Sequence, residues 1–413
     1  MKVLLLNQSF APDTTATAQH LVDLALLLIE QGHEVTVVAD ERDYETRRVR
    51  YPRRSKWQGV CVVRVPSTAF GKRSFVHRAL DALVLQCGYL GSLFGLPRQD
   101  LVVSFTSPPL VGLWGAIYCR ARGARNIQWL MDLNVDAAIA LGMLRETSLL
   151  ARLLLAVQRR VLRGADLVVV EDRYTADRAV QRGAARERTV IVPPWPAQEW
   201  APQSAPAPRR PNRLRDRLEL GDRFVVMYSG NHAAAHPLDT LLGAAVACQD
   251  DPALVFLFVG GGVRVSQVRD AIARHRLKNI VQLPLQPRDE LAETLAAADL
   301  HVVVMANAMN GLGHPSKVYG ILAAGRPWLL IGPRESCVGD LATQCPGGYQ
   351  VEQGDVAGAL GAIRSAQSLT GRERLDNFQA QQHLLHSCFG RQRSLTRFLD
   401  AAIPPESRAR LRK

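Results

Sequence analysis

The sequence predicts an α/β protein made of two doubly wound parallel sheets, one in each half of the chain. Three observations lead to this fold class: the chain length, the alternation of apolar runs with helical patterns, and a proline-rich break between the halves. At 413 residues the chain is too long for one ordinary core and suits two domains of about 200 residues each. Hydrophobic residues make up 47% and charged residues 22%, which excludes extensive disorder.

The first half begins with a strand, a helix and a second strand. Residues 3–7 form an apolar run without an exposed face, which indicates a buried parallel strand. Apolar residues recur at helical spacing over 16–31, Gly32 supplies a left-handed cap, and 34–39 reads as a strand. Such a succession forms a right-handed parallel unit. Further strands are expected at residues 101–106, 127–131, 166–170 and 191–195, with a helix at 110–122.

The same alternation restarts after a proline-rich connector. Residues 201–212 contain four prolines and no apolar period, which is typical of an extended linker. We expect a second doubly wound sheet beyond it. Its strands are predicted at 224–228, 254–259, 280–283, 299–304 and 328–331, and its helices at 238–248 and 316–324.

The cysteines and the apolar segments indicate the compartment. The seven cysteines show no C-x-x-C spacing, so we expect reduced, mostly packed thiols and no zinc site. The apolar run at the N-terminus is shorter than the ~7–15 residues of a signal-peptide core. Residues 79–96 include Asp81 and Gln86 and fall short of the ~20 residues that span a bilayer. We therefore expect a cytoplasmic protein.

The net charge of +13 is concentrated in two segments. Residues 41–80 carry eleven Lys and Arg against three Asp and Glu, and residues 391–413 carry seven against two. Phosphate on a lipid surface, a phosphorylated acceptor and nucleic acid are partners for such charge, and a solvated basic surface is the alternative. No domain that reads bases is recognisable, so we expect no nucleic-acid partner.

The stretch from Gly311 to Pro327 carries the most specific signal. Ser316 and Lys317 open a predicted helix, whose free N–H groups and positive dipole form an anion site. Lys317 adds a full positive charge, and Gly325 ends the helix. An ordinary capped helix with an exposed lysine is the alternative.

Several segments, in order along the chain, carry a family resemblance. They are Y-S-G-N at 228–231 with His236, F-V-G-G-G at 258–262, L-Q-P at 285–287, and P-S-K-V-Y-G-I-L-A-A-G-R-P at 315–327. With these segments the chain resembles the family 4 glycosyltransferases, in the branch that builds bacterial surface polysaccharides. The resemblance implies the GT-B fold, in which two facing Rossmann-like domains enclose an interdomain cleft, and sugar transfer with retention of anomeric configuration. It also implies a nucleoside diphosphate sugar as donor, most often a UDP-sugar, with neither a metal nor another cofactor.

The resemblance assigns roles to the domains. Residues 1–200 would bind the acceptor and 213–385 the nucleotide sugar, while a C-terminal helix within 386–413 would return to the first domain ahead of a basic tail. A polyprenyl-diphosphate-linked saccharide is the acceptor that such relatives imply. The basic segment 42–78, a loop with aromatic residues, is then expected to lie on anionic lipid. This would make the chain a peripheral protein on the inner face of the plasma membrane.

The donor site follows from the same resemblance. The diphosphate would be met by Lys317, by the Ser316 helix terminus and by the backbone around Gly230 and Asn231. His236 would add positive charge if it were protonated. The expected donor-binding residues are Gly230, Asn231, Gly261, Leu285, Gly313, Ser316, Lys317 and Glu335, and the expected catalytic residues are Asp132, Lys317 and His236.

One departure from the family pattern concerns the ribose. Many relatives carry two glutamates eight residues apart across this loop and helix, and the second binds the ribose hydroxyls. Leu312 and Gly320 stand at these positions here. Because Gly320 has no side chain to accept a hydrogen bond, Glu335 is our candidate replacement.

On the acceptor side, Asp132 and Asp136 follow a predicted strand, where ligands of open parallel sheets collect. Asp132 would orient the acceptor hydroxyl or take its proton, and a helix cap without catalytic duty is the alternative. Thr15 lies in a loop that faces the acceptor in relatives. Glu171 and Asp172 either line the cleft or cap the next helix.

Two other functions fit the same fold. A nucleotide-sugar epimerase or sugar-phosphate synthase would share it, because fold alone does not determine chemistry. The departures at Leu312 and Gly320 would also fit a non-catalytic GT-B scaffold that assists a true transferase.

Overall fold

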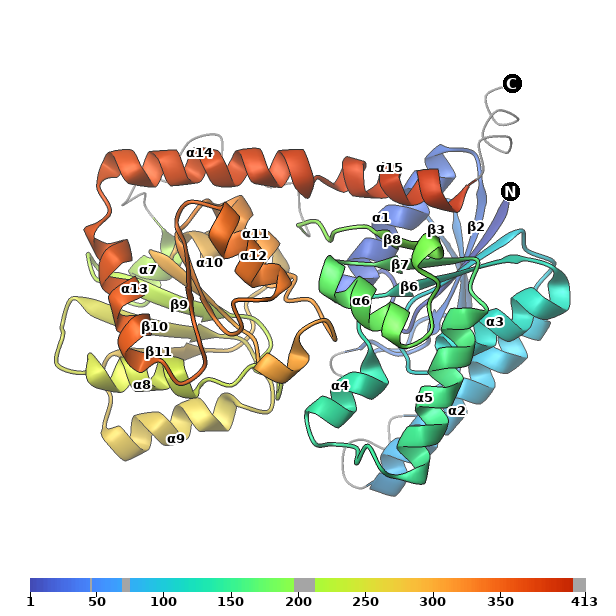
Figure 1. The fold of residues 1–413 in the computed structure, drawn as a ribbon, viewed down its shortest axis with the longest axis horizontal. Helices are drawn as coiled ribbons and strands as arrows, with labels where there is room; N and C mark the ends of the chain where they lie inside the picture. The colour runs from blue at the N-terminus through green and yellow to red at the C-terminus, as the bar shows by residue number, and fades with distance from the viewer. Residues whose placement is uncertain (45–46, 69–74, 197–211, 404–413) are drawn as a thin grey trace. The chain divides into compact units, whose positions relative to one another are not determined.

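Two compact units make up the protein, each built around one sheet (Figure 1). The computed structural model describes residues 1–44, 47–68, 75–196 and 212–403. Unit 1 comprises the described residues within 1–193, 312–314 and 392–413, and unit 2 those within 194–311 and 315–391. The short segment 312–314 therefore joins the first unit, although it lies in the second half of the sequence.

The sheet of unit 1 has eight strands in the order β3-β4-β2-β1-β5-β6-β7-β8, and its neighbours are parallel except for β3 with β4. The strands β1, β5 and β7 are buried on both faces because their residues are apolar, apart from the exposed Lys2 and the buried Ser104. The strands are β1 (Lys2–Leu6), β2 (Glu34–Asp40), β3 (Arg54–Trp57), β4 (Val60–Val65), β5 (Leu101–Ser104), β6 (Arg125–Leu130), β7 (Leu167–Val170) and β8 (Thr189–Ile191). The helices are α1 (Ala16–Glu30), α2 (Phe75–Phe94), α3 (Val111–Arg122), α4 (Asn134–Ala140), α5 (Leu149–Arg163), α6 (Arg173–Gln181) and α15 (Arg391–Ala402).

A β-hairpin occupies part of the segment that we predicted to be a cationic loop. Gln58 and Gly59 join β3 to β4, and both have positive φ, 46° and 87°, as two-residue hairpin turns require. β4 pairs with β2 and buries all four of its valines. The loop prediction for 42–78 was therefore wrong over residues 54–65, where the valines of β4 decide the structure.

Buried acids neutralise part of the basic charge in this region. Arg47 forms an ion pair with Asp40, and the Arg50 guanidinium lies 2.7 Å from the Glu41 carboxylate. Both acids are buried. The basic surface expected here is thus smaller than the count of arginines indicates. Its exposed members on or beside β3 are Arg53, Arg54 and Lys56. The parts of our predictions that concern 69–74, 201–211 and 404–413 lie outside the described residues.

The sheet of unit 2 has six parallel strands in the order β11-β10-β9-β12-β13-β14. The order of the strands along the chain reverses between β9 and β12, which makes this place the topological switch point. The strands are β9 (Phe224–Ser229), β10 (Leu254–Val259), β11 (Ile280–Leu283), β12 (Leu300–Val304), β13 (Trp328–Ile331) and β14 (Gly348–Val351). The helices are α7 (Arg213–Arg217), α8 (Asp239–Ala247), α9 (Val265–His275), α10 (Leu291–Ala296), α11 (Lys317–Ala324), α12 (Cys337–Gln344), α13 (Val356–Ser368) and α14 (Gly371–Cys388).

Side chains of β9 alternate between two cores. Val226 and Tyr228 belong to the core beneath α8, α9 and α13, whereas Val225 and Met227 belong to the core that includes α7. This alternation is the period of a strand buried on both faces. The predicted fold class, two doubly wound parallel α/β sheets, is confirmed.

The predicted elements differ from the structure mainly at their ends. β8 ends at Ile191 and not at residue 195, because Pro193 and Pro194 follow and proline cannot donate to a strand ladder. Three of the seven cysteines, Cys61, Cys87 and Cys388, are exposed rather than packed. Within the described ranges, no helix combines the length and the apolar character that crossing a membrane requires.

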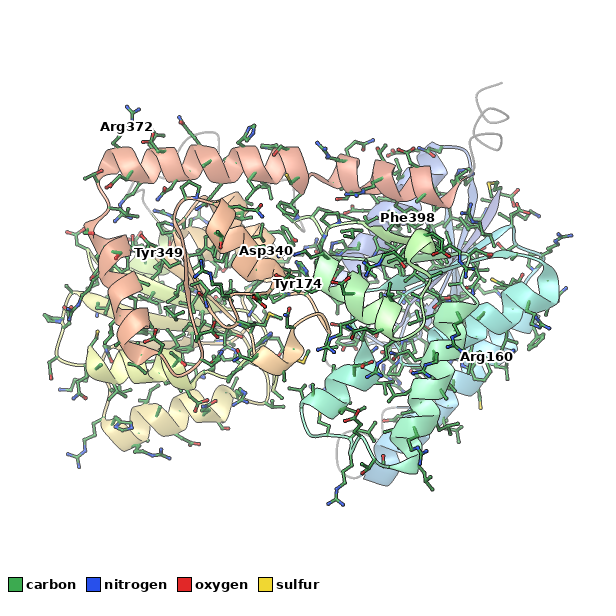
Figure 2. The ribbon with its side chains drawn as sticks, viewed as in Figure 1. Arg160, Tyr174, Asp340, Tyr349, Arg372 and Phe398 are labelled. Carbon is green, nitrogen blue, oxygen red and sulfur yellow. The ribbon has the colours of Figure 1, made fainter. Side chains whose placement is uncertain are left out.

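From Gln392 onward, α15 packs within unit 1. The ring of Phe398, labelled in Figure 2, stacks on Trp129 of β6 with centroids 4.9 Å apart. The Arg125 guanidinium donates to the carbonyl oxygens of Ala401 and Ala402 at the C-terminal turn, where a cation is favoured. These contacts fix the helix against β6.

Candidate functional site

Two loops of unit 2 meet at the switch point of its sheet. One follows β9 and the other follows β12, and the N–H of Ala306 donates to the carbonyl oxygen of Ala235 at 3.0 Å. Ligands of open α/β sheets collect at the carboxyl ends of the strands at such a point. The loops therefore frame the place where a ligand of this unit is expected.

Glycines allow the loops after β9 and β10 to approach closely. A Cβ on Gly260 would lie 2.1 Å from the carbonyl oxygen of Gly230, and one on Gly262 would lie 2.7 Å from that of His232. All three glycines also have positive φ between 129° and 135°. Gly261 has open space at its Cβ position, and its carbonyl oxygen accepts the N–H of His232 at 2.7 Å. The glycine run is thus required by backbone packing.

Lys317, the first residue of α11, presents its ammonium group to these loops. Its Nζ donates to the Tyr228 hydroxyl at 3.0 Å and lies 4.1 Å from the centre of that ring. The Tyr228 hydroxyl in turn donates to the carbonyl oxygen of Asn231 at 2.9 Å. A Cβ on Gly230 would lie 3.2 Å from Nζ, so the ammonium also lies against the first loop.

Burial lowers the pKa of Lys317 to about 7. Among the described residues, no carboxylate lies within ion-pair distance of Nζ. Ser316 precedes the helix as its N-cap, and its side chain makes no capping hydrogen bond there. A helix N-terminus with a lysine that lacks an acidic partner is an arrangement that favours an anion.

His236 lies on the loop after β9 but is not a source of positive charge. Its Nδ1 donates to the carbonyl oxygen of Asn231 at 2.9 Å. Burial, and next the charge of Lys317, lower the pKa of His236 to about 3. The expectation that a protonated His236 supplies positive charge is therefore wrong for the ligand-free protein.

A second set of polar groups lies in unit 1, where β6 and β7 end. Asp132 follows β6, and Glu171 and Asp172 follow β7. The segment Leu312–His314 runs beside them: the N–H of Leu133 donates to the carbonyl oxygen of Leu312 at 2.8 Å, and Asp132 and Gly313 form an antiparallel bridge.

His314 anchors this segment. Its Nδ1 lies 2.7 Å from the Asp172 carboxylate, and both side chains are largely buried. Burial acts to raise the pKa of Asp172, but hydrogen bonding and charge from His314 outweigh it, and the pKa is lowered. Asp172 also caps α6 by accepting the N–H of Thr175 at 2.8 Å, as one of our two alternatives predicts.

The pKa values of the neighbouring carboxyl groups, Glu171 and Asp132, are raised. Burial, and next the charges of Asp132 and Asp172, raise the pKa of Glu171 well above its ordinary value. Desolvation raises the pKa of Asp132 to about 7. Asp132 does not cap α4, because the N-cap of that helix is Leu133 and has no side-chain hydrogen bond. A carboxyl group that titrates near neutrality suits proton transfer.

Two residues expected on the acceptor side have structural partners. The Asp136 carboxylate pairs with Arg182, whose Nε is 2.6 Å away, and accepts from Gln158 at 2.8 Å. These contacts engage both carboxylate oxygens of the buried Asp136 and tie α4 to α5 and to the C-cap of α6, which corrects our expectation that Asp136 serves the acceptor. The Thr15 hydroxyl caps α1 at Ala18.

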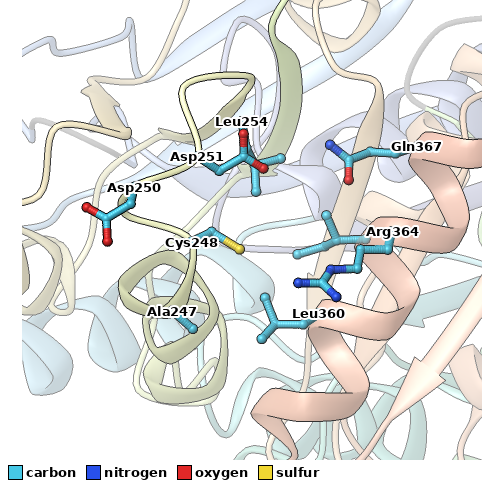
Figure 3. A pocket seen from close by; sticks show the side chains of 9 residues that line it. Ala247, Cys248, Asp250, Asp251, Leu254, Leu360, Arg364 and Gln367 are labelled. Atoms are coloured by element: carbon cyan, nitrogen blue, oxygen red, sulfur yellow. The ribbon is translucent and has the colours of Figure 1, made fainter.

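Unit 2 has a hollow at the amino end of its strands, opposite the end that carries Lys317 (Figure 3). Its volume is about 110 Å³, and Cys248, Asp251 and Arg364 are among its lining residues. Asp251 precedes β10, so the hollow lies at the amino end of that strand. Because ligands of doubly wound sheets collect at the carboxyl ends, we place no substrate here.

The chain is similar in sequence to known proteins. Residues 15–195 match the model of a glycosyl transferase 4-like domain. WcaI of Escherichia coli (strain K12), a protein named as a glycosyl transferase of colanic acid biosynthesis, is 26% identical over 389 residues, which cover 89% of this chain and 92% of WcaI. These likenesses support the resemblance to the family 4 glycosyltransferases.

Solved structures show that the chain has the GT-B fold. The structure of Anabaena HepE in complex with UDP and glucose has a TM-score of 0.69 at 15% identity, over 97% of this chain and 98% of HepE. WaaG, a glycosyltransferase involved in lipopolysaccharide biosynthesis, has a TM-score of 0.68 at 14% identity, over 95% and 98%. The similarity in fold to HepE and WaaG extends along both halves of the chain.

The ribose-binding side of the site stays a prediction. Gly320 lies on α11, and a Cβ there would meet the Leu295 side chain at an ordinary 3.5 Å. Glu335 is exposed in the loop after β13, where its carbonyl oxygen accepts from the Asn310 side chain at 2.5 Å. Leu285 is exposed after β11.

His314 was missed by the sequence reasoning, as was the structural role of Asp136. His314 lies inside the motif that we singled out, but its partner Asp172 is 142 positions away. Likewise, Arg182 is 46 positions from Asp136. Only the folded chain shows such pairs.

Proposed function

We propose that this glycosyltransferase moves a sugar from a UDP-sugar to a hydroxyl group of a lipid-linked saccharide, with retention of configuration, during assembly of a cell-surface polysaccharide. Unit 2 binds the UDP portion through the loops after β9 and β10 and the start of α11. Unit 1 binds the acceptor near Asp132. UDP is the nucleotide bound to HepE, WcaI is named for colanic acid biosynthesis, and WaaG is named for lipopolysaccharide biosynthesis.

The observation that carries the proposal is the ammonium group of Lys317. It lies between Tyr228 and Gly230 at the switch point, and no carboxylate in the described part of the chain pairs with it. As the bond between the anomeric carbon and the β-phosphate oxygen breaks, negative charge grows on the departing UDP. A cation already held in place stabilises that charge without reorganisation, which is the dominant demand of the reaction.

Asp132 serves the acceptor. The acceptor oxygen forms the new bond to the anomeric carbon on the face that UDP leaves, and its proton must be removed as the bond forms. Asp132 titrates near neutrality, so a substantial fraction is ionised at pH 7 and can orient this hydroxyl or receive its proton.

Turnover with purified components tests the proposal. UDP release is measured from UDP-, GDP- and dTDP-sugars, with and without an extracted lipid-linked saccharide. We expect release from a UDP-sugar that depends on the acceptor, and a loss of about 2–4 kcal/mol in transition-state stabilisation for Lys317→Ala. Near wild-type turnover of Lys317→Ala would contradict the donor site.

A peripheral position on the inner face of the plasma membrane completes the proposal. The exposed Arg53, Arg54 and Lys56 on or beside β3 supply basic charge, each worth about 1 kcal/mol near anionic lipid. Co-sedimentation with phosphatidylglycerol vesicles should decrease when all three become serine. The matched control carries serine at Arg274, Arg276 and Lys278, exposed positions at the end of α9 in unit 2. Equal losses in both variants would contradict a specific basic face.

A further inference from the structure

Unit 1 contains an apolar groove that the proposed function leaves unassigned. Its volume is about 280 Å³, near the lower end of the range for ligand sites. α3, α4, α5 and the end of β6 supply its walls. The walls are mainly aliphatic and include Leu130, Leu133, Leu144, Leu154, Val157 and Val161. A groove of this kind offers few hydrogen bonds and therefore favours a hydrocarbon ligand.

One end of the groove is polar and reaches the proposed acceptor site. Asp132 and Asn134 line it there, and Asn134 is held by donating to the carbonyl oxygen of Thr106 at 2.7 Å. A ligand whose chain fills the groove would thus place its polar head next to Asp132. This is the geometry that an amphipathic substrate requires.

The stripe of apolar residues on α5 continues beyond the groove into solvent. Leu154, Val157 and Val161 recur at helical spacing, and Leu150 extends the same face by one turn toward the N-terminus of the helix. Leu150 is 51% exposed and Leu149 is 83% exposed. Large apolar side chains that gather at one exposed place mark an interaction surface.

Basic residues flank this exposed end. Met143 and Leu153 are exposed as well, and Arg145 and Arg152 are exposed beside them in the sequence, with Glu146 as the exposed acid of this segment. Further along α5, Arg160 is exposed as well and is labelled in Figure 2. Exposed leucines with neighbouring arginines are typical of a helix whose end enters the headgroup region of a bilayer.

From these observations we infer that the groove holds the isoprenoid chain of the acceptor lipid, which enters at Leu150 and leads the polar part of the acceptor toward Asp132. The inference rests on the proposed lipid-linked acceptor. It assigns a binding site for the hydrocarbon, a part of the substrate that takes no part in the reaction. The occupant is hydrocarbon because the lining is aliphatic, and it comes from a membrane because the open end is apolar with basic flanks.

Prenyl diphosphates of increasing length are the probes. Dimethylallyl, geranyl and farnesyl diphosphate share one head group and carry one, two and three isoprene units. Their affinities are measured by calorimetry below the concentration at which farnesyl diphosphate aggregates, with saturating UDP present to block the donor site. We expect affinity to increase at least on the order of tenfold from the shortest probe to the longest, because each further buried methylene favours binding.

Leu154→Gln should remove most of this dependence on chain length, since it places an amide in the wall of the groove. The matched control is Leu375→Gln, at a leucine of α14 that is 37% exposed in unit 2. A second groove variant, Ala138→Gln, changes another wall residue, so that misfolding of one protein does not end the test. Circular dichroism and UDP affinity establish that each variant is folded.

Equal affinity for the three diphosphates would overturn the inference, and so would a chain-length dependence that both groove variants retain. Self-association of the wild type that Leu154→Gln abolishes, without any chain-length dependence, would assign the groove to a second copy and also overturn it. The proposed function can fail independently of this inference. If farnesyl diphosphate binds as expected but UDP does not bind, the groove stands and the UDP-dependent transfer fails.

Discussion

Binding of UDP is expected to weaken steeply above neutral pH, because Lys317 keeps its charge only below its own pKa. Burial lowers that pKa to about 7 in the ligand-free protein. A bound diphosphate would stabilise the ammonium group and return its pKa toward the ordinary 10.5, so binding above pH 7 takes up a proton. From about pH 7 to about pH 9 the dissociation constant for UDP should therefore rise about 50-fold, equivalent to about 2 kcal/mol.

Isothermal titration calorimetry with UDP measures this effect in two ways. The dissociation constant reports the affinity at each pH, and repetition in buffers of different ionisation enthalpy reports the proton uptake. His236 does not contribute, because its pKa is lowered to about 3 and it is neutral throughout this window. Lys317→Arg keeps a positive charge at every pH tested and should give a flat profile.

Asp132→Asn provides the matched control, because Asp132 lies in unit 1 and is assigned to the acceptor. Its pKa is also about 7, so it would produce a similar profile if it governed UDP binding. We expect this variant to keep the wild-type pH dependence. A flat wild-type profile would refute the role of Lys317, and so would a pH dependence that survives in Lys317→Arg.

Four further results are expected. The pKa of Lys317 is 10.5 in the unfolded chain and about 7 in the folded chain, so the free energy of unfolding should rise with pH between these values. Lys317→Met removes the cost of burying the charge, so its melting temperature at pH 7 should be higher than that of the wild type. Asp132→Asn should leave UDP affinity within about twofold but lower turnover by about 10²–10⁴, as steady-state kinetics with saturating donor will show. A Cβ at Gly320 meets the Leu295 side chain only at an ordinary 3.5 Å, so Gly320→Glu should stabilise α11 by about 0.5–1 kcal/mol in thermal unfolding, and it should tighten UDP binding if its carboxylate reaches the ribose. Arg47→Ser leaves the Asp40 side chain, 1% exposed, without its cation and should cost about 1–3 kcal/mol in urea unfolding, whereas Arg53→Ser at an exposed position should change stability by less than about 0.5 kcal/mol.

Much of the fold could be predicted from the sequence because the central strands have no exposed face. β1, β5 and β7 are short apolar runs between polar loops, and a run of that kind admits few other structures. The β3–β4 hairpin was missed because its first strand, R-S-K-W, carries charge at an edge of the sheet, where one side meets water. Sequence pattern is least informative for such strands.

The candidate site was predictable in its positions but not in its charges. Lys317 begins α11 as the motif predicts, because Pro315 and Ser316 favour a helix start. The neutral state of His236 depends on burial and on an ammonium group that is 81 positions away in the sequence, and no local pattern contains either. The same holds for Glu171, whose raised pKa comes from burial beside Asp132, at the end of the neighbouring strand, and beside the adjacent Asp172.

The leucine at position 312, where relatives carry the first of two glutamates, follows from its surroundings in unit 1. Its side chain is 4% exposed, and its carbonyl oxygen accepts the N–H of Leu133. The segment that contains it runs beside Asp132 and pairs with Asp172 through His314. A glutamate at 312 would bury another carboxylate next to acids that are already costly to ionise, at an expense of more than about 2 kcal/mol. Since the backbone bridge between Asp132 and Gly313 holds the segment without any side chain from 312, leucine satisfies the packing, and this departure from the family pattern needs no loss of catalysis to explain it.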